Sequence, residues 1–246
     1  MSPNPRNIRL MRLCCLSGLF GSILFLGGDM LFYGNFVSGA EFHPYSEMAA
    51  RSLLLLIAGG AIGPIAALFS AYGMGIFYWT LEPGSRKWAR VTAALLAIMM
   101  LIGGAYHALY TCLGFAAKVT EKTTREMLLT QVASLRDTIS YPMYAAGGAG
   151  TVLAYLLVFL SKTRFPRWLL IFLPTTLSLA SSTFRSYFLL IPAPVGGLVR
   201  GGWINGSFVL FFGIATCVFW RLDIELTGSP YSIDNQGDKE RSRYTA

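Results

Sequence analysis

Long apolar runs alternate along the chain with short polar segments, and most of these runs are long enough to cross a bilayer as a helix. Because an α-helix rises about 1.5 Å per residue, about 20 apolar residues span a hydrocarbon core of about 30 Å. The runs that meet this length cover residues 13–33, 51–81, 91–117, 142–161, 168–191 and 202–220. The pattern therefore predicts an all-α membrane helix bundle with six transmembrane spans.

The ends of the chain differ from this membrane domain, which we place at residues 13–221. Residues 1–12 form a short basic tail, and residues 222–246 are polar and lack any hydrophobic periodicity. A segment that buries little apolar surface cannot offset the conformational entropy lost on ordering, so we expect residues 222–246 to be disordered.

Two local patterns add detail to this alternation of spans and loops: an amphipathic segment between two spans and a proline inside one span. Apolar residues recur at helical spacing within residues 120–138, which predicts an amphipathic helix on the outer membrane surface. Thr123 and Glu126 have the spacing of a capping box at its start. In the second span, Pro64 removes one backbone hydrogen bond, so we expect a kink there.

The charge pattern gives the orientation. Hydrophobic residues make up 54% of the chain and charged residues only 13%, with a net charge of +8. The basic residues lie in short segments between apolar runs and form no single patch, which argues against a nucleic-acid partner. The two tails and the loops on their side hold 13 of the 20 lysines and arginines, against 6 in the opposite loops. Cytoplasmic loops are enriched in these residues, so both termini are predicted to be cytoplasmic.

Four cysteines and two histidines give no sign of a metal or redox centre. The cysteines, Cys14, Cys15, Cys112 and Cys217, form no C-x-x-C pair and have no metal-ligand spacing with the histidines. We interpret them as packing residues within the membrane, and we predict no cofactor and no metal.

Asp29 is the only acidic residue inside any of the long apolar runs. A carboxylate at the centre of a spanning helix costs about 2.5–3.5 kcal/mol, so it normally faces the bundle interior and finds a polar partner. Counted from the basic residues at the cytoplasmic ends of their spans, Asp29, His107 and Arg185 all lie about 25–27 Å deep. Asn205 and Tyr110 fall at a comparable level, and Ser182 lies on the same polar stripe as Arg185. We therefore predict a polar layer in the outer half of the membrane.

The residues leave the role of this layer open. Asp29 and Arg185 could simply neutralise each other and fix helix packing, with the neighbouring polar groups completing the hydrogen bonds. Alternatively, the layer could bind a small amphipathic or anionic ligand, which we take as the leading functional hypothesis. Two further classes remain: an enzyme acting on a lipid-like substrate through Asp29 and His107, and a structural subunit that binds a protein partner of unknown kind.

Several short motifs together resemble a family of small bacterial six-span membrane proteins of unknown function. The motifs are Gly28-Asp29, Gly59 to Pro64, His107-Ala108, Phe165 to Trp168 and Pro192 to Asn205. The resemblance covers about residues 15–215 and leaves out the tail past Arg221. It implies a six-helix bundle in a bacterial cytoplasmic membrane, and it supplies no catalytic residues to transfer.

Overall fold

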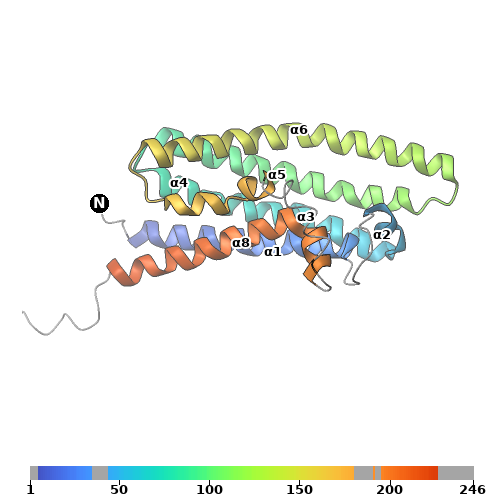
Figure 1. The fold of residues 1–246 in the computed structure, drawn as a ribbon, viewed down its shortest axis with the longest axis horizontal. Helices are drawn as coiled ribbons and strands as arrows, with labels where there is room; N and C mark the ends of the chain where they lie inside the picture. The colour runs from blue at the N-terminus through green and yellow to red at the C-terminus, as the bar shows by residue number, and fades with distance from the viewer. Residues whose placement is uncertain (1–4, 35–43, 180–190, 192–194, 227–246) are drawn as a thin grey trace, which may run out of the picture.

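The computed structural model describes residues 5–34, 44–179, 191 and 195–226, and it is a bundle of helices (Figure 1). Within that part of the chain, five helices are long and apolar enough to cross a membrane. They cover Asn7–Tyr33, Leu53–Leu81, Arg86–Ala117, Lys122–Leu160 and Gly201–Arg221. The all-helical architecture and five of the predicted spans are therefore confirmed as membrane-compatible helices.

The long helices lie side by side along one axis. Helix α1 (Pro5–Tyr33) packs against α3 (Leu53–Gly73) and against α8 (Val195–Leu226), while α5 (Arg86–Ala117) packs between α3 and α6 (Lys122–Leu160). At the start of α1, the guanidinium of Arg12 donates to the carbonyl of Trp220 at 3.2 Å and lies 4.8 Å from its ring centre. The beginning of α1 and the final turns of α8 therefore share one end of the bundle, which we call the terminal end.

The second predicted span is interrupted beyond Pro64, and the kink expected at Pro64 itself stays a prediction. Helix α3 continues through Pro64 without a break, and the interruption comes at Met74, after which α4 (Gly75–Leu81) begins. A short helix, α2 (Pro44–Ala50), precedes this span. The hydroxyl of Thr111 on α5 donates to the carbonyl of Leu56 at 3.0 Å, which ties α3 to α5 on the Asp29 side of the bundle.

Helix α6 joins two segments that the sequence separated. It runs for 39 residues through Pro142, so residues 120–138 and the predicted fourth span form one helix and not a surface helix followed by a span. At about 1.5 Å per residue it is about 58 Å long. Packing along α5 holds the two halves in line although Pro142 removes one backbone bond. Its cap is Glu121, whose carboxylate accepts from the amides of Thr123 and Thr124, in place of the predicted capping box.

The predicted fifth span lies largely outside the described residues. Its first part is a 3₁₀ helix, η1 (Arg167–Phe172), followed by helical residues 174–179. Ser182 and Arg185 are not among the residues that the structure describes. In α8 the backbone is non-helical at Gly202 (φ −118°, ψ 18°), which is where the sequence placed the start of the sixth span.

Two hydrophobic clusters fill the bundle. The larger lies toward the terminal end, where the rings of Phe77, Phe165 and Phe211 stack at 5.5–5.8 Å. The smaller lies toward the opposite end and includes Phe32, Tyr33 and Leu56. All four cysteines are free; Cys14 and Cys15 are buried as expected, whereas Cys112 and Cys217 are exposed and do not pack in the interior.

Candidate functional site

Three helices bring polar side chains together near the end of α1. Asp29 lies in the last turns of α1, His107 lies on α5, and Asn205 lies on α8 just past the non-helical Gly202. Their convergence requires the helices to approach closely, and glycines allow this. A Cβ added at Gly28 would lie 2.6 Å from Cε1 of His107, and one added at Gly63 of α3 would lie 2.9 Å from its Nδ1.

The carboxylate of Asp29 is surrounded by donors from all three helices. Asp29 and His107 are each only 5% exposed. The hydroxyl of Tyr33 donates to Oδ1 at 2.8 Å, and the amide of Asn205 donates to Oδ2 at 2.6 Å. Nε2 of His107 lies 3.3 Å from Oδ1. Both carboxylate oxygens therefore have hydrogen-bond donors inside the bundle, as a buried polar group requires.

His107 is enclosed by aromatic rings and by glycine backbone. Its ring centre lies 5.4 Å from that of Phe25 and 5.2 Å from that of Phe32. Nε2 is in ion-pair range of Asp29 but is not aligned with it as a hydrogen bond, and among the described residues Nδ1 has no hydrogen-bond partner. The imidazole therefore retains hydrogen-bonding capacity that the described residues do not use.

Three tyrosines extend this polar layer away from Asp29. Tyr110 is one helical turn from His107 on α5, and its ring lies 6.1 Å from that of Tyr33. The hydroxyls of Tyr110 and Tyr106 lie 3.4 Å apart. The layer therefore continues from α1 along α5 toward α6.

The structure brings together some of the predicted site residues. Asp29, His107 and Asn205 meet directly, and Tyr110 adjoins them, whereas Ser182 and Arg185 lie outside the described residues. Whether these residues bind a ligand stays a prediction.

Sequence reasoning missed the direct role of Tyr33. Its position four residues after Asp29 was the available signal, because residues at i and i+4 share a helix face.

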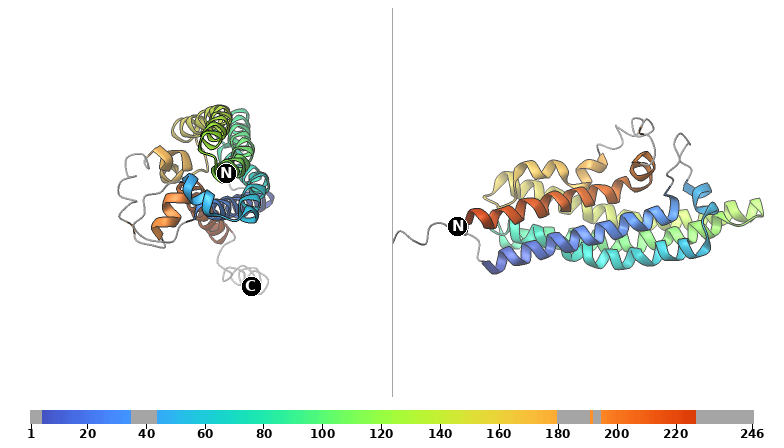
Figure 2. Two further views of the ribbon diagram at one scale, coloured as in Figure 1. Left: turned by 90° about the vertical axis from the view of Figure 1, so that its right-hand side faces the viewer. Right: turned by 90° about the horizontal axis from the view of Figure 1, so that it is seen from below.

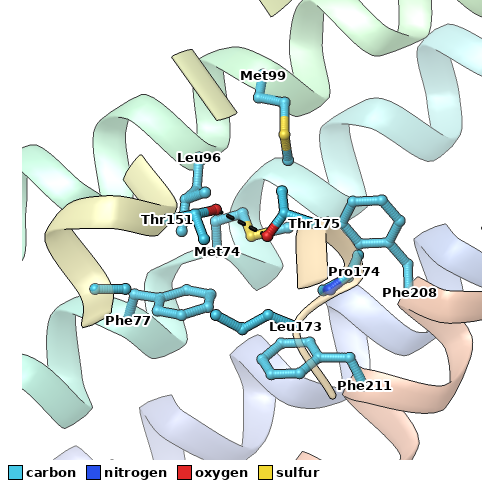
Figure 3. Close-up of a pocket in the computed structure, with 11 residues that line it drawn as sticks. Met74, Phe77, Leu96, Met99, Thr151, Leu173, Pro174, Thr175, Phe208 and Phe211 are labelled. Carbon is cyan, nitrogen blue, oxygen red and sulfur yellow. Dashed lines mark hydrogen bonds between the residues drawn. The ribbon is translucent and has the colours of Figure 1, made fainter. Parts of the chain in front are cut away.

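The described residues also hold a small cavity away from Asp29 (Figure 3). It lies between α5, α6 and α8 and has a free volume of about 20 Å³, enough for a water molecule. Its wall is mostly Met, Phe and Leu side chains, and its polar part is a hydrogen-bonded pair, Thr151 and Thr175, whose hydroxyls lie 3.0 Å apart. Thr175 is the first residue of the polar stripe that also contains Ser182 and Arg185 in the sequence.

Metal binding has no support in the described ranges, since no group of three or more His, Cys, Asp or Glu side chains gathers there. The Asp29–His107 pair offers one carboxylate and one imidazole, which is fewer ligands than a structural or catalytic zinc site uses. One carboxylate beside one imidazole is a combination that can form hydrogen bonds and share a proton.

Comparison with known proteins identifies a family but no activity. No curated protein and no solved structure matches the chain. One protein family, described as a family of unknown function (DUF6796), matches residues 1–221, which include every span and the whole polar layer. The chain therefore belongs to the family of unknown function DUF6796.

Proposed function

We propose that this integral membrane protein uses the Asp29–His107 pair as a proton-binding site that controls the contact between α1 and α8. The observation that supports it most strongly is the meeting of two ionisable side chains from different helices, each 5% exposed and 3.3 Å apart. Ionisable groups inside a membrane bundle are costly and are most often functional.

The pair has two protonation states with different hydrogen bonding. When Asp29 is ionised, it accepts strong, charge-assisted bonds from Asn205 and Tyr33. When Asp29 takes up a proton, the charge disappears and both bonds weaken, since bonds to a charged group are worth about twice as much as neutral ones. Proton binding therefore changes how strongly α8 is held to α1.

The backbone of α8 has a point at which such a change can act. The non-helical residue Gly202 lies three positions before Asn205 and separates the first turns of α8 from its long straight part. A residue with non-helical backbone angles inside a helix can act as a hinge, about which the two helical segments rotate relative to each other. We expect α8 to move relative to α1 about Gly202 when the Asn205 bond weakens.

Spin labels on the two helices test this directly. A side chain added at Gly27 of α1 or at Gly206 of α8 meets no described atom within 4 Å. Cysteines placed there, in a background with Cys112 and Cys217 replaced by serine, take labels beside the pair. The label separation should change as the pH is lowered, and it should be independent of pH in Asp29→Asn.

Glu82→Gln is the matched control, because Glu82 is an acid that directly follows α4, and α4 begins beside Cys14 in the first half of α1, far along the helix from Asp29. It should keep the full pH response. A separation that is independent of pH in the parent protein, or a response that survives Asp29→Asn, would refute the proposal.

The orientation belongs to the same proposal: both termini cytoplasmic, with the polar layer in the outer half of a bacterial inner membrane. It is supported by the excess of basic residues on one side and by the contact between Arg12 and Trp220, which puts both described terminal helices at one end. An alkaline phosphatase fused to the C-terminus should be inactive, and an active fusion would overturn the orientation.

A further inference from the structure

We infer that Tyr33, Tyr110 and Tyr106 form the path by which protons reach the Asp29–His107 pair, and that this path opens on α6 at Arg136 and Asp137. This inference rests on the proposed proton-binding function and goes beyond it, because it says from which side and through which groups the site exchanges protons.

The path consists of two hydroxyl contacts joined by a contact between two tyrosine rings. Tyr33 donates directly to Asp29 at 2.8 Å, and Tyr106 and Tyr110 have their hydroxyls 3.4 Å apart. The rings of Tyr33 and Tyr110 are in contact, with centres 6.1 Å apart. This middle step is the longest, and it requires the two rings to move together or a water molecule to bridge them.

The outer end of the series reaches a charged surface. The guanidinium of Arg136 lies within electrostatic range of both Tyr106 and Tyr110, and it bonds to Asp137 at 2.6–2.9 Å. Arg136 is partly buried while Asp137 is 55% exposed. The first turns of α6, where Lys122, Arg125 and Glu126 also lie, extend past the end of α1 (Figure 2). In the orientation proposed above, this part of α6 lies toward the outer solution, so the exposed carboxylate of Asp137 has access to protons from that side.

Toward the terminal end, the pair is shielded by apolar groups. Phe25 covers His107 on that side, and it belongs to the large hydrophobic cluster that also contains Ala66, Ala67 and Phe208. Glycines of α3 close the remaining approach, since Gly59 and Gly63 lie against Gly28 and His107. Protons cross such a layer poorly, so the tyrosine side is the favoured entrance.

Within the described ranges, no other ionisable group at the Asp29 end provides a shorter proton path to the Asp29–His107 pair. Among the described residues, α3 faces the pair with glycines and α8 with Asn205. Tyr45 on α2 packs on the cluster around Tyr33, and Arg51 donates to the carbonyl of Gly34. The groups that face the pair or lie along the path are Tyr33 on α1, Tyr106, His107 and Tyr110 on α5, and Arg136, Asp137 and Tyr144 on α6.

The transfer is balanced at every step. A proton taken up from solution beside Asp137 passes through a bridging water to the oxygen of Tyr106 as that hydroxyl releases its own proton to Tyr110. A second bridging water accepts the proton released by Tyr110 and gives one of its own to Tyr33, which releases its proton to Asp29. Each tyrosine ends with the O–H bond count that it started with, and one proton is gained by the pair. No oxidant, reductant or other reactant takes part.

A laser flash that releases protons, followed by infrared detection of the Asp29 carboxylic acid, measures how fast Asp29 is protonated. A pH titration of the same infrared band measures the equilibrium separately. The band is assigned by its absence in Asp29→Asn. Because phenylalanine keeps the ring and removes the hydroxyl, Tyr110→Phe and Tyr106→Phe should each slow the appearance of the band by about tenfold or more. The pH midpoint of the band should stay where it is in the parent protein, whereas a merely structural change would move it.

Tyr141→Phe is the control, since Tyr141 is 71% exposed on the same part of α6. It should leave the rate unchanged. Unchanged rates in both Tyr110→Phe and Tyr106→Phe would overturn the path while leaving the proton-binding function intact. If the parent protein shows no Asp29 band at any pH, the proposed function itself fails.

Discussion

Glycines let helices approach closely along the bundle, as Gly18 of α1 and Gly73 of α3 do nearer the terminal end, but the two ends differ in the side chains that meet there. Toward the terminal end, large side chains fill the space between helices, and the rings of Phe77, Phe165 and Phe211 stack on one another. At the Asp29 end, glycines let the helices approach until polar side chains meet. In a bilayer, packing and hydrogen bonds both drive helix association, and here each dominates one end. The first end is suited to fixing the fold, and the second to changing state.

The largest effect on stability is expected from removing one ring of the aromatic stack. Phe211 is fully buried, so Phe211→Ala should lower the free energy of unfolding by about 3–5 kcal/mol, through lost contacts and the cavity left behind. Phe159→Ala is the control, because Phe159 is 56% exposed and its loss should cost much less. Unfolding in mixed micelles measures both. Equal costs would show that the stack does not hold this end.

At the Asp29 end, the expected signature is coupling between two helices. Asp29→Asn and Asn205→Leu should each destabilise the protein, and a double-mutant cycle should show a coupling of about 1–3 kcal/mol, because the two side chains share one hydrogen bond. Thr216→Ala serves as the comparison on α8, since Thr216 bonds only to Phe212 in its own helix. Additive losses for Asp29 and Asn205 would contradict the observed contact.

Two adjacent glycines test the role of close approach. Gly28→Ala would force a Cβ to 2.6 Å from Cε1 of His107 and 3.1 Å from the carbonyl of Gly59, so it should cost about 1–3 kcal/mol. Gly27 faces open space, and Gly27→Ala should instead stabilise the helix by about 0.5–1 kcal/mol. Thermal melts show whether each substitution raises or lowers the stability of the protein. If both substitutions stabilise the protein, the Asp29 end is not tightly packed.

The smallest effect concerns the start of α6, which lies beyond both packed regions. Hydrogen bonds from the hydroxyl of Thr124 and from the amides of Thr124 and Thr123 lower the pKa of Glu121 to about 2. Because this pKa is below its ordinary 4.5, the ionised cap stabilises the helix above pH 4.5, and this is lost as the pH falls through about 2.

Hydrogen exchange of the first turn of α6 measures this loss. Protection should decrease across that pH range in the parent protein and be low throughout in Glu121→Gln. Glu126→Gln, at an exposed position one turn further on, should keep the parent behaviour. Identical pH profiles for the parent and Glu121→Gln would show that the Glu121 carboxylate does not stabilise the first turn of α6.

Hydropathy predicted much of this fold, since span length and spacing are properties of single segments. It placed Asp29, His107 and Asn205 at one depth, because depth follows from counting residues along a helix. It could not say which of them touch, because contact depends on how helices rotate and pack. The continuity of α6 through Pro142 likewise depends on packing along α5, which no local pattern records. The pairing of Asp29 with Arg185 stays a prediction.

Nitrogen NMR of His107 tests the central claim most directly. The chain has two histidines, so with His43→Gln the spectrum of ¹⁵N-histidine-labelled protein in lipid reports His107 alone. The nitrogen shifts of His107 should change with pH, and Asp29→Asn should move the midpoint of that change, because the carboxylate lies 3.3 Å from Nε2. An identical titration with and without the Asp29 carboxylate would contradict the account.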